Sequence, residues 1–247
     1  MPTQIRLSGI RFRYAPSAAE ALRGCDLAMD ASRITVLMGQ NGAGKSTLIR
    51  LLTGQLLGYA GEYRIDGESQ QPRRGEILHQ NRIGYMPDAP ALETHLTGAE
   101  MIQMAASFRG LPEGRFQEAL APYRGSFELG SWLEDRTCSE YSKGMAKKVS
   151  LVMAFIGDPA FHILDEPFDG LDPLAVLNLR RLLDACRTEG RGALVSSHAL
   201  DAAEKVADDV VLMRAGEIAF AGEMESLRAS QAGAGGLEAF YMRSLAS

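Results

Sequence analysis

A glycine-rich segment carries the clearest chemical signal in the sequence. Residues 39–46 read Gly-Gln-Asn-Gly-Ala-Gly-Lys-Ser and match the pattern G-x-x-x-x-G-K-[ST]. An apolar run at 34–38 predicts a buried strand before this loop, and a helix is predicted after it at 45–57. Glycines let successive backbone N–H groups converge on phosphate oxygens, and the helix N-terminus adds a favourable dipole. We therefore predict a nucleotide-phosphate site, with Lys45 reaching the β and γ phosphates and the Ser46 hydroxyl binding Mg²⁺.

The strand before the loop and the helix after it weigh against a chance match. A glycine-rich turn with a surface lysine is the simplest alternative, but it requires neither of these flanking elements. The residues that we predict to contact the nucleotide are Gly39, Asn41, Gly42, Ala43, Gly44, Lys45, Ser46 and Thr47.

Two adjacent acids follow a second apolar run. Residues 161–164 (Phe-His-Ile-Leu) predict a strand that ends at Asp165 and Glu166. Asp165 can hold Mg²⁺, usually through water, and Glu166 can orient and polarise an attacking water. Acids at a strand end can also be capping or surface charges, but the phosphate loop upstream favours the catalytic interpretation.

A histidine follows a third predicted strand. Residues 193–197 read Ala-Leu-Val-Ser-Ser, and His198 comes next. The carboxyl ends of parallel strands lie at one edge of a sheet, so we predict that His198 lies near the acids and contacts the γ-phosphate. A structural histidine is the alternative. Lys45, Glu166 and His198 are thus the predicted catalytic residues.

The elements that must position these groups alternate along the chain. Further strands are predicted at 4–14, with a bulge at Ser8-Gly9, and at 22–29, 62–67, 82–86 and 210–213, the last opening a hairpin that turns at 214–216. Helices are predicted at 173–188 and 200–206, and a helical stretch at 97–157 is broken by Gly110, Pro112, Pro122 and Gly125. Alternating strands and helices imply an α/β fold with a mostly parallel sheet.

Composition and charge exclude several classes of protein. The 247 residues are 46% hydrophobic and 23% charged, which is ordinary for a globular protein, and the formal net charge of -5 argues against nucleic-acid binding. Three cysteines without C-x-x-C spacing indicate a reducing compartment, and the N-terminus lacks the pattern of a signal peptide. The apolar run at 149–157 is about half of the roughly 20 residues that cross a bilayer, so any link to a membrane should come through a partner.

The order of these motifs resembles a known family. Tyr141-Ser-Lys-Gly-Met145 stands before Asp165 and resembles the Leu-Ser-Gly-Gly-Gln signature of ABC ATPases, and the resemblance runs from about residue 4 to 228. It implies a P-loop NTPase (RecA-like) core with an antiparallel β subdomain and a helical subdomain, using ATP and Mg²⁺. The domain would span 1–228, with the helical subdomain at about 92–157, followed by a linker and short C-terminal helix at 229–247.

The resemblance also implies roles for single residues. Ser142 and Gly144 would open a helix that faces the γ-phosphate bound by the opposite subunit, although Ser142 can also be an ordinary helix cap. Tyr14 resembles the aromatic residue that stacks on adenine, with core packing as the alternative. Asp172 resembles the acid that communicates between the two sites. Asp88 stands where the family usually has a Gln that contacts Mg²⁺, so it would be a shorter, charged metal ligand.

The resemblance predicts a transport ATPase at the cytoplasmic face of a membrane, held there by a separate permease subunit. The signature and the basic helix start Lys147-Lys148 look most like the branch that serves type 2 bacterial exporters. The working unit would be a homodimer, or a heterodimer with a paralogous ATPase. A soluble ABC ATPase acting in cofactor or cluster assembly is the alternative, because it shares every nucleotide motif. The intact Lys45, Asp165, Glu166 and His198 argue against a non-catalytic regulator.

Overall fold

Two sheets organise the chain in a computed structural model that describes residues 4–70, 82–198, 200–230 and 236–246. The larger sheet has the strand order β10-β9-β3-β8-β7-β6. Its members are β3 (Ile34–Met38), β6 (Ile83–Met86), β7 (Phe161–Asp165), β8 (Gly192–Ser196), β9 (Asp209–Arg214) and β10 (Glu217–Glu223). All neighbouring pairs are parallel except β9 with β10, so the predicted mostly parallel sheet is confirmed. Continuous apolar runs formed its central strands because both of their faces are buried.

The second sheet is antiparallel and has the order β2-β1-β4-β5. Its strands are β1 (Gln4–Phe12), β2 (Leu22–Asp30), β4 (Ala60–Ile65) and β5 (Glu68–Ser69). The predicted bulge in the first strand is confirmed, because the β1–β2 register shifts between Leu7 and Ile10 and Gly9 has φ 59°. The predicted hairpin turn is also confirmed: Ala215 and Gly216 both have positive φ, as the tight turn between β9 and β10 requires.

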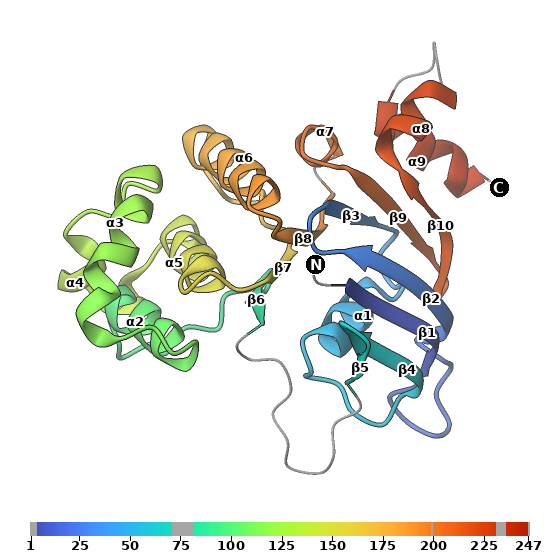
Figure 1. The fold of residues 1–247 in the computed structure, drawn as a ribbon, viewed down its shortest axis with the longest axis horizontal. Helices are drawn as coiled ribbons and strands as arrows, with labels where there is room; N and C mark the ends of the chain where they lie inside the picture. Colours follow the sequence, from blue (N-terminus) through green and yellow to red (C-terminus); the bar gives the residue numbers. More distant parts are fainter. Residues whose placement is uncertain (1–3, 71–81, 199, 231–235, 247) are drawn as a thin grey trace.

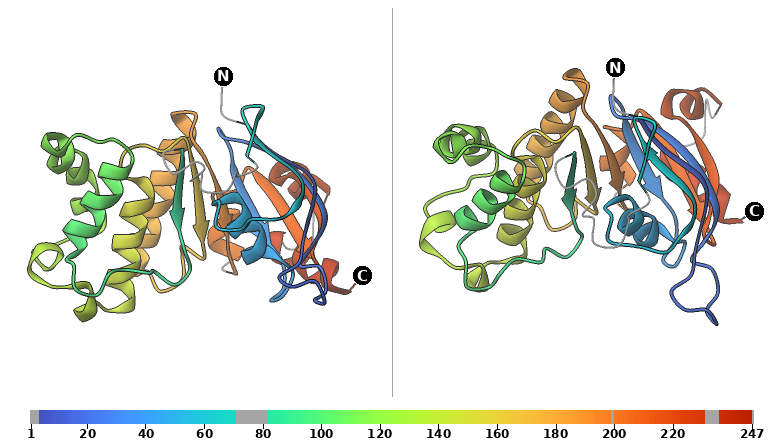
Figure 2. Two further views of the ribbon diagram at one scale, coloured as in Figure 1. Left: turned by 90° about the horizontal axis from the view of Figure 1, so that it is seen from below. Right: turned by 60° about the horizontal axis from the view of Figure 1, so that its bottom comes forward.

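Four of the helices, α2 to α5, form a group of their own. The helices are α1 (Lys45–Leu52), α2 (Gly98–Phe108), α3 (Phe116–Ser126), α4 (Trp132–Asp135), α5 (Lys143–Phe155), α6 (Pro173–Thr188), α7 (Leu200–Glu204), α8 (Met224–Ser230) and α9 (Gly236–Ala246), with 3-10 turns η1 (Glu113–Arg115) and η2 (Cys138–Glu140). Figures 1 and 2 show α2 to α5 gathered beside β6, on the opposite side of the parallel sheet from β1, β2 and β4.

The buried apolar side chains form two clusters, one on each face of the parallel sheet. Along β3, Val36 and Met38 face the cluster that contains α2 to α6, whereas Leu37 faces the cluster that contains α1 and the antiparallel sheet. Helix α1 contributes Leu48, Ile49, Leu51 and Leu52 to that second cluster. The helix that follows the phosphate loop is thus packed between the two sheets, which fixes its N-terminus at the sheet edge.

Two predicted helices end earlier than expected. The helix predicted at 45–57 ends at Leu52, because Gly54 (φ 72°) adopts a left-handed conformation and its N–H bonds to the carbonyl of Leu51 at 3.0 Å. The helix predicted at 200–206 ends at Glu204.

Pro122 and Gly125 were predicted to break the helical stretch, but both lie inside α3. Proline removes one backbone hydrogen bond from a helix interior. Phe116 and Leu120 are fully or almost fully buried in the same helix, and this tertiary burial outweighs the local cost.

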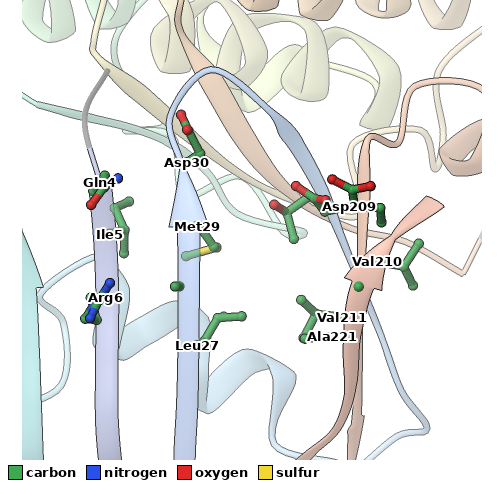
Figure 3. Close-up of a pocket in the computed structure, with 14 residues that line it drawn as sticks. Gln4, Ile5, Arg6, Leu27, Met29, Asp30, Asp209, Val210, Val211 and Ala221 are labelled. Carbon is green, nitrogen blue, oxygen red and sulfur yellow. The ribbon is translucent and has the colours of Figure 1, made fainter. Parts of the chain in front are cut away.

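A gap opens where the edges of the two sheets diverge. The backbone N–H of Arg23 in β2 donates to the carbonyl of Gly216 at 2.8 Å, and from there the strands separate around a cavity of about 350 Å³. Figure 3 shows residues of β1 and β2 on one side of it and residues of β9 and β10 on the other. This gap holds none of the predicted nucleotide contacts.

The C-terminal helix packs back onto the core. Leu237 is fully buried, its N–H donates to the Glu204 carboxylate of α7 at 3.0 Å, and Phe240 lies against Phe220 of β10 with ring centroids 4.9 Å apart. Of the linker predicted within 229–247, residues 231–235 lie outside the described residues. Within the described ranges, no helix has both the length and the apolar character that crossing a bilayer requires.

Candidate nucleotide site

The phosphate loop is held in a shape that only glycine allows at two of its positions. Gly39 has φ 153°, and a Cβ there would lie 2.5 Å from the Met213 carbonyl oxygen. Gly44 has φ 106° at the N-cap of α1, and a Cβ there would lie 2.8 Å from the Ala21 carbonyl oxygen. The loop therefore enters α1 with its backbone N–H groups at a helix N-terminus, which is an anion-binding arrangement.

Lys45 folds back over this loop. Its Nζ donates to the carbonyl oxygens of Gly39 at 2.5 Å and Gln40 at 3.3 Å. Burial lowers the pKa of Lys45, and the nearby Glu166 and Asp165 carboxylates oppose that shift. The ammonium is thus placed inside the loop and close to two acids, where it can bind a phosphate.

The two acids are fixed by the neighbouring strand β8. The Asp165 carboxylate accepts a hydrogen bond from the Ser196 hydroxyl, and the Glu166 N–H donates to that hydroxyl oxygen at 3.0 Å and to the Ser196 carbonyl at 3.2 Å. The Glu166 carboxylate accepts a hydrogen bond from the backbone N–H of His198 at 2.9 Å, and its Oε1 lies 3.3 Å from the ring nitrogen Nε2 of His198. The parallel pairing of β7 with β8 therefore brings both acids and the histidine to one sheet edge.

Most of the predicted site residues line one cleft of about 430 Å³. Its lining residues are Tyr14, Ala21, Gln40, Asn41, Gly42, Gly44, Lys45, Ser46, Thr47, Asp88, Asp165, Glu166 and His198. Gly39 and Ala43 belong to the loop but do not line the cleft, and Ala43 is buried. Ser142 and Gly144 lie outside this cleft, at the start of α5. Ala21 and Gln40 also line the cleft, although neither was predicted to contact the nucleotide.

Comparison with known proteins decides which family carries this cleft. The family described as ABC transporter matches residues 22–169, more than half of the chain, including the phosphate loop, both acids and Ser142. The chain is a nucleotide-binding member of the ABC transporter family. The resemblance inferred from the motif order is confirmed, and the family binds and hydrolyses ATP.

Individual relatives and solved structures support the same family and fold. The ABC-type transporter ATP-binding protein EcsA of Bacillus subtilis (strain 168) is 32% identical over 209 residues, covering 84% of this chain and 83% of EcsA. A solved ATP-binding subunit of an ABC transporter is 31% identical, covers 97% of this chain and 98% of its own, and has a TM-score of 0.88. A dimeric ATP-binding cassette with ADP and phosphate shares the fold at 18% identity, with a TM-score of 0.80 over 89% of this chain and 98% of its own. The predicted P-loop NTPase fold is confirmed.

In this ABC ATPase, Tyr14 lies at the mouth of the cleft. It follows β1 and is 58% exposed, with its Oη 3.1 Å from Thr47 Oγ1 and its ring edge-on to Phe12. The core-packing alternative is therefore wrong. Stacking on adenine stays a prediction, favoured by an exposed aromatic face beside the phosphate loop.

Replacing Tyr14 by Ala should weaken ATP binding by about five- to 150-fold, because stacking of a base on an aromatic ring contributes about 1–3 kcal/mol. Titration of a fluorescent ATP analogue measures the effect. Tyr14→Phe is the matched control: it also removes the hydroxyl near Thr47 but keeps the ring, so it should bind nearly as tightly as the unmodified chain. Equal losses in the two variants would show that the hydroxyl, and not the ring, holds the nucleotide.

Asp88 follows β6 and reaches the same cleft. Its side chain is 58% exposed, and its Oδ1 lies 3.4 Å from Nζ of Lys147. Lys147 is fully buried and also donates to the Glu166 carbonyl at 2.8 Å. Asp88 therefore keeps an oxygen at the cleft, paired with a lysine from α5.

Two residues that support the site, Lys147 and Ser196, were not predicted to contact its acids. A helical pattern could have pointed to Lys147, because Ser150, Leu151 and Ala154 follow it at i+3, i+4 and i+7 and all are buried. Ser196 ends a fully buried strand directly beside Asp165 in the sheet. A polar residue on a buried face needs partners, and here the partners are catalytic candidates.

The signature segment caps α5. The Ser142 Oγ accepts a hydrogen bond from the Met145 N–H at 3.2 Å, so the helix-cap interpretation is confirmed by the geometry. Asp172 caps α6 in the same way, accepting from Ala175 N–H at 2.8 Å, and it pairs with Lys148 at 2.7 Å. The roles of Ser142 and Asp172 in a second subunit's site stay predictions.

Proposed function

We propose that this chain is the ATP-hydrolysing subunit that drives a separately encoded membrane permease. One observation carries the hydrolytic part: the Glu166 carboxylate, with His198 bonded to it, lies in the same cleft as Lys45 and the phosphate loop. Glu166 would orient and polarise the attacking water, and His198 and Lys45 would contact the γ-phosphate.

The cleft also has the donors that Mg²⁺ prefers. The Ser46 hydroxyl of α1, the Asp165 carboxylate of β7 and the Asp88 carboxylate in the loop after β6 supply oxygen atoms, and Mg²⁺ binds oxygen ligands together with substrate phosphates. These three residues would hold the ion, and bound Mg²⁺ neutralises charge on the transferring phosphate.

The second subunit follows from where Ser142 and Gly144 lie. Both stand at the N-terminus of α5 but outside the chain's own cleft, and Ser142 is exposed. A helix N-terminus favours an anion, so we propose that they contact the γ-phosphate held by a second copy or by a paralogous ATPase. The dimeric cassette with this fold supports a dimer.

Transport is favoured over soluble cofactor assembly. EcsA, which matches this chain over most of both lengths, is described as part of an ABC-type transporter. We propose a peripheral position at the cytoplasmic face, export as the direction, and a domain at 1–228 with a helical subdomain at about 92–157. The linker and terminal helix at 229–247 would complete the chain.

A pull-down tests the proposed partner. Tagged Glu166→Gln protein is expressed in the native host, MgATP is added to solubilised membranes, and co-purifying proteins are identified by mass spectrometry. We expect one polytopic membrane protein in stoichiometric amount, and much less of it when ATP is omitted. Recovery of soluble partners alone, with the chain absent from membranes, would contradict the transport proposal. Inside-out vesicles that contain the recovered permease and this chain then test the direction of transport. Export predicts that ATP drives uptake of the transported compound into their lumen.

A further inference from the structure

Lys147 is a buried cation that contacts two carboxylates and one backbone carbonyl at or beside the nucleotide site. Its side chain has no exposed surface. Its Nζ lies 2.8 Å from the Glu166 carbonyl oxygen, 3.4 Å from Asp88 Oδ1 and 3.9 Å from Asp169 Oδ2. A buried ammonium is costly unless it is paired and hydrogen-bonded, so these oxygens are what keep it there.

The bond to Glu166 fixes a backbone conformation that is unusual for this residue type. Glu166 has φ 48°, in the left-handed region, which persists in non-glycine residues when the surroundings over-determine it. Its N–H is held by Ser196 and its carbonyl by Lys147. Strand β8 and helix α5 therefore clamp the Glu166 main chain from two sides, and the clamp directs the carboxylate toward His198.

Lys147 acts from outside the cleft. It is not among the residues that line the cleft, and it stands in α5 shortly after the cap Ser142. Two neighbouring lysines of α5 reach the segment after Glu166: Lys143 pairs with Asp169 at 2.8 Å and Lys148 with Asp172 at 2.7 Å. The helix that carries the signature is thus tied to the segment that carries the proposed base.

We propose that Lys147 is a positioning residue for ATP hydrolysis, which holds Glu166 in its hydrolysis-ready conformation and makes that conformation depend on where α5 stands. The proposal rests on the proposed function, because it assigns a task to Glu166. Since Lys147 touches Glu166 through its main chain and not through the bound nucleotide, its loss should slow turnover more than it weakens binding.

Lys147→Met tests this, because methionine fills the space of the lysine stem without the ammonium. We expect kcat for ATP to fall by about 10- to 100-fold, since a displacement of about 1 Å in a reacting group costs on the order of 10²-fold. The KM for ATP should stay within about threefold. Lys147→Arg, which keeps a donor, should recover at least part of the lost kcat.

Arg109→Met is the matched structural control. Arg109 is a partly buried cation that, like Lys147, donates to backbone carbonyls: those of Met153 at 2.6 Å and Ile156 at 2.9 Å, at the end of α5 and far from Glu166 in sequence. We expect Arg109→Met to lower Tm with kcat nearly unchanged. A kcat of Lys147→Met within about threefold of that of Arg109→Met, or no recovery in Lys147→Arg, would overturn the proposal.

Hydrogen exchange separates this proposal from the proposed function. Lys147→Met should speed amide exchange in residues 165–169, and Arg109→Met should not. This comparison needs no ATP turnover. Unchanged exchange there overturns the role of Lys147 whatever the enzyme does, whereas absence of ATP turnover in the unmodified chain with its permease would contradict the proposed function and leave the exchange result standing.

Discussion

Glu166→Gln should abolish ATP turnover and leave ATP bound. Loss of a positioned general base costs about 10²- to 10⁴-fold, and an amide can neither accept the proton of the attacking water nor polarise it as a carboxylate does. Glutamine has the size of glutamate and can still accept the His198 N–H through its amide oxygen, so the cleft should keep its shape. Phosphate release measures kcat, and calorimetric titration with ATP measures Kd.

The same variant should collect in the closed dimer, because ATP stays bound between the subunits. Size-exclusion chromatography with and without MgATP detects this, in the presence of the permease if one is required. Glu189→Gln is the control, since Glu189 is an exposed acid paired with Arg191 at the far end of α6. If Glu166→Gln kept more than about a tenth of the turnover of Glu189→Gln, Glu166 would not be the base.

Lys45→Ala should remove most of the nucleotide binding. A hydrogen bond to a charged group contributes about 1.5–3 kcal/mol, which corresponds to a loss of about 10- to 100-fold in ATP affinity. The loss should be larger for ATP than for a nucleotide without β and γ phosphates, because Lys45 lies inside the phosphate loop. Titration with ATP and AMP measures both.

The pH dependence of ATP affinity is a second test of the role of Lys45 in binding. Because burial lowers the pKa of its ammonium, Lys45 in the free chain loses its proton at a lower pH than an exposed lysine. The affinity for ATP should therefore begin to fall, as pH rises, at a pH below the ordinary pKa of lysine.

Lys205→Ala is the control for Lys45→Ala, since it removes an equal charge from an exposed position. Equal losses of ATP affinity in Lys45→Ala and Lys205→Ala would show that Lys45 acts only through the net charge of the chain.

The sequence by itself determined the phosphate loop, the parallel sheet and the edge at which the acids meet. These features depend on short stretches of chain: glycines that permit one backbone path, apolar runs that must be buried, and acids directly after a strand. Predictions of helix ends and breaks failed where a second local signal or tertiary burial opposed the first signal. Gly54 ends α1 earlier than the apolar pattern indicates, and Pro122 is accommodated inside α3 because burial outweighs its local cost.

Only the tertiary structure decided which residues support the proposed base. Lys147 meets Glu166 across 19 positions of sequence, and Ser196 meets it across 30. Neither contact has a local signature, because it exists only once β7, β8 and α5 are packed together. The same holds for Tyr14, whose exposure at the cleft no strand pattern could give, and for Ser142, which the packing of α5 places outside the chain's own site.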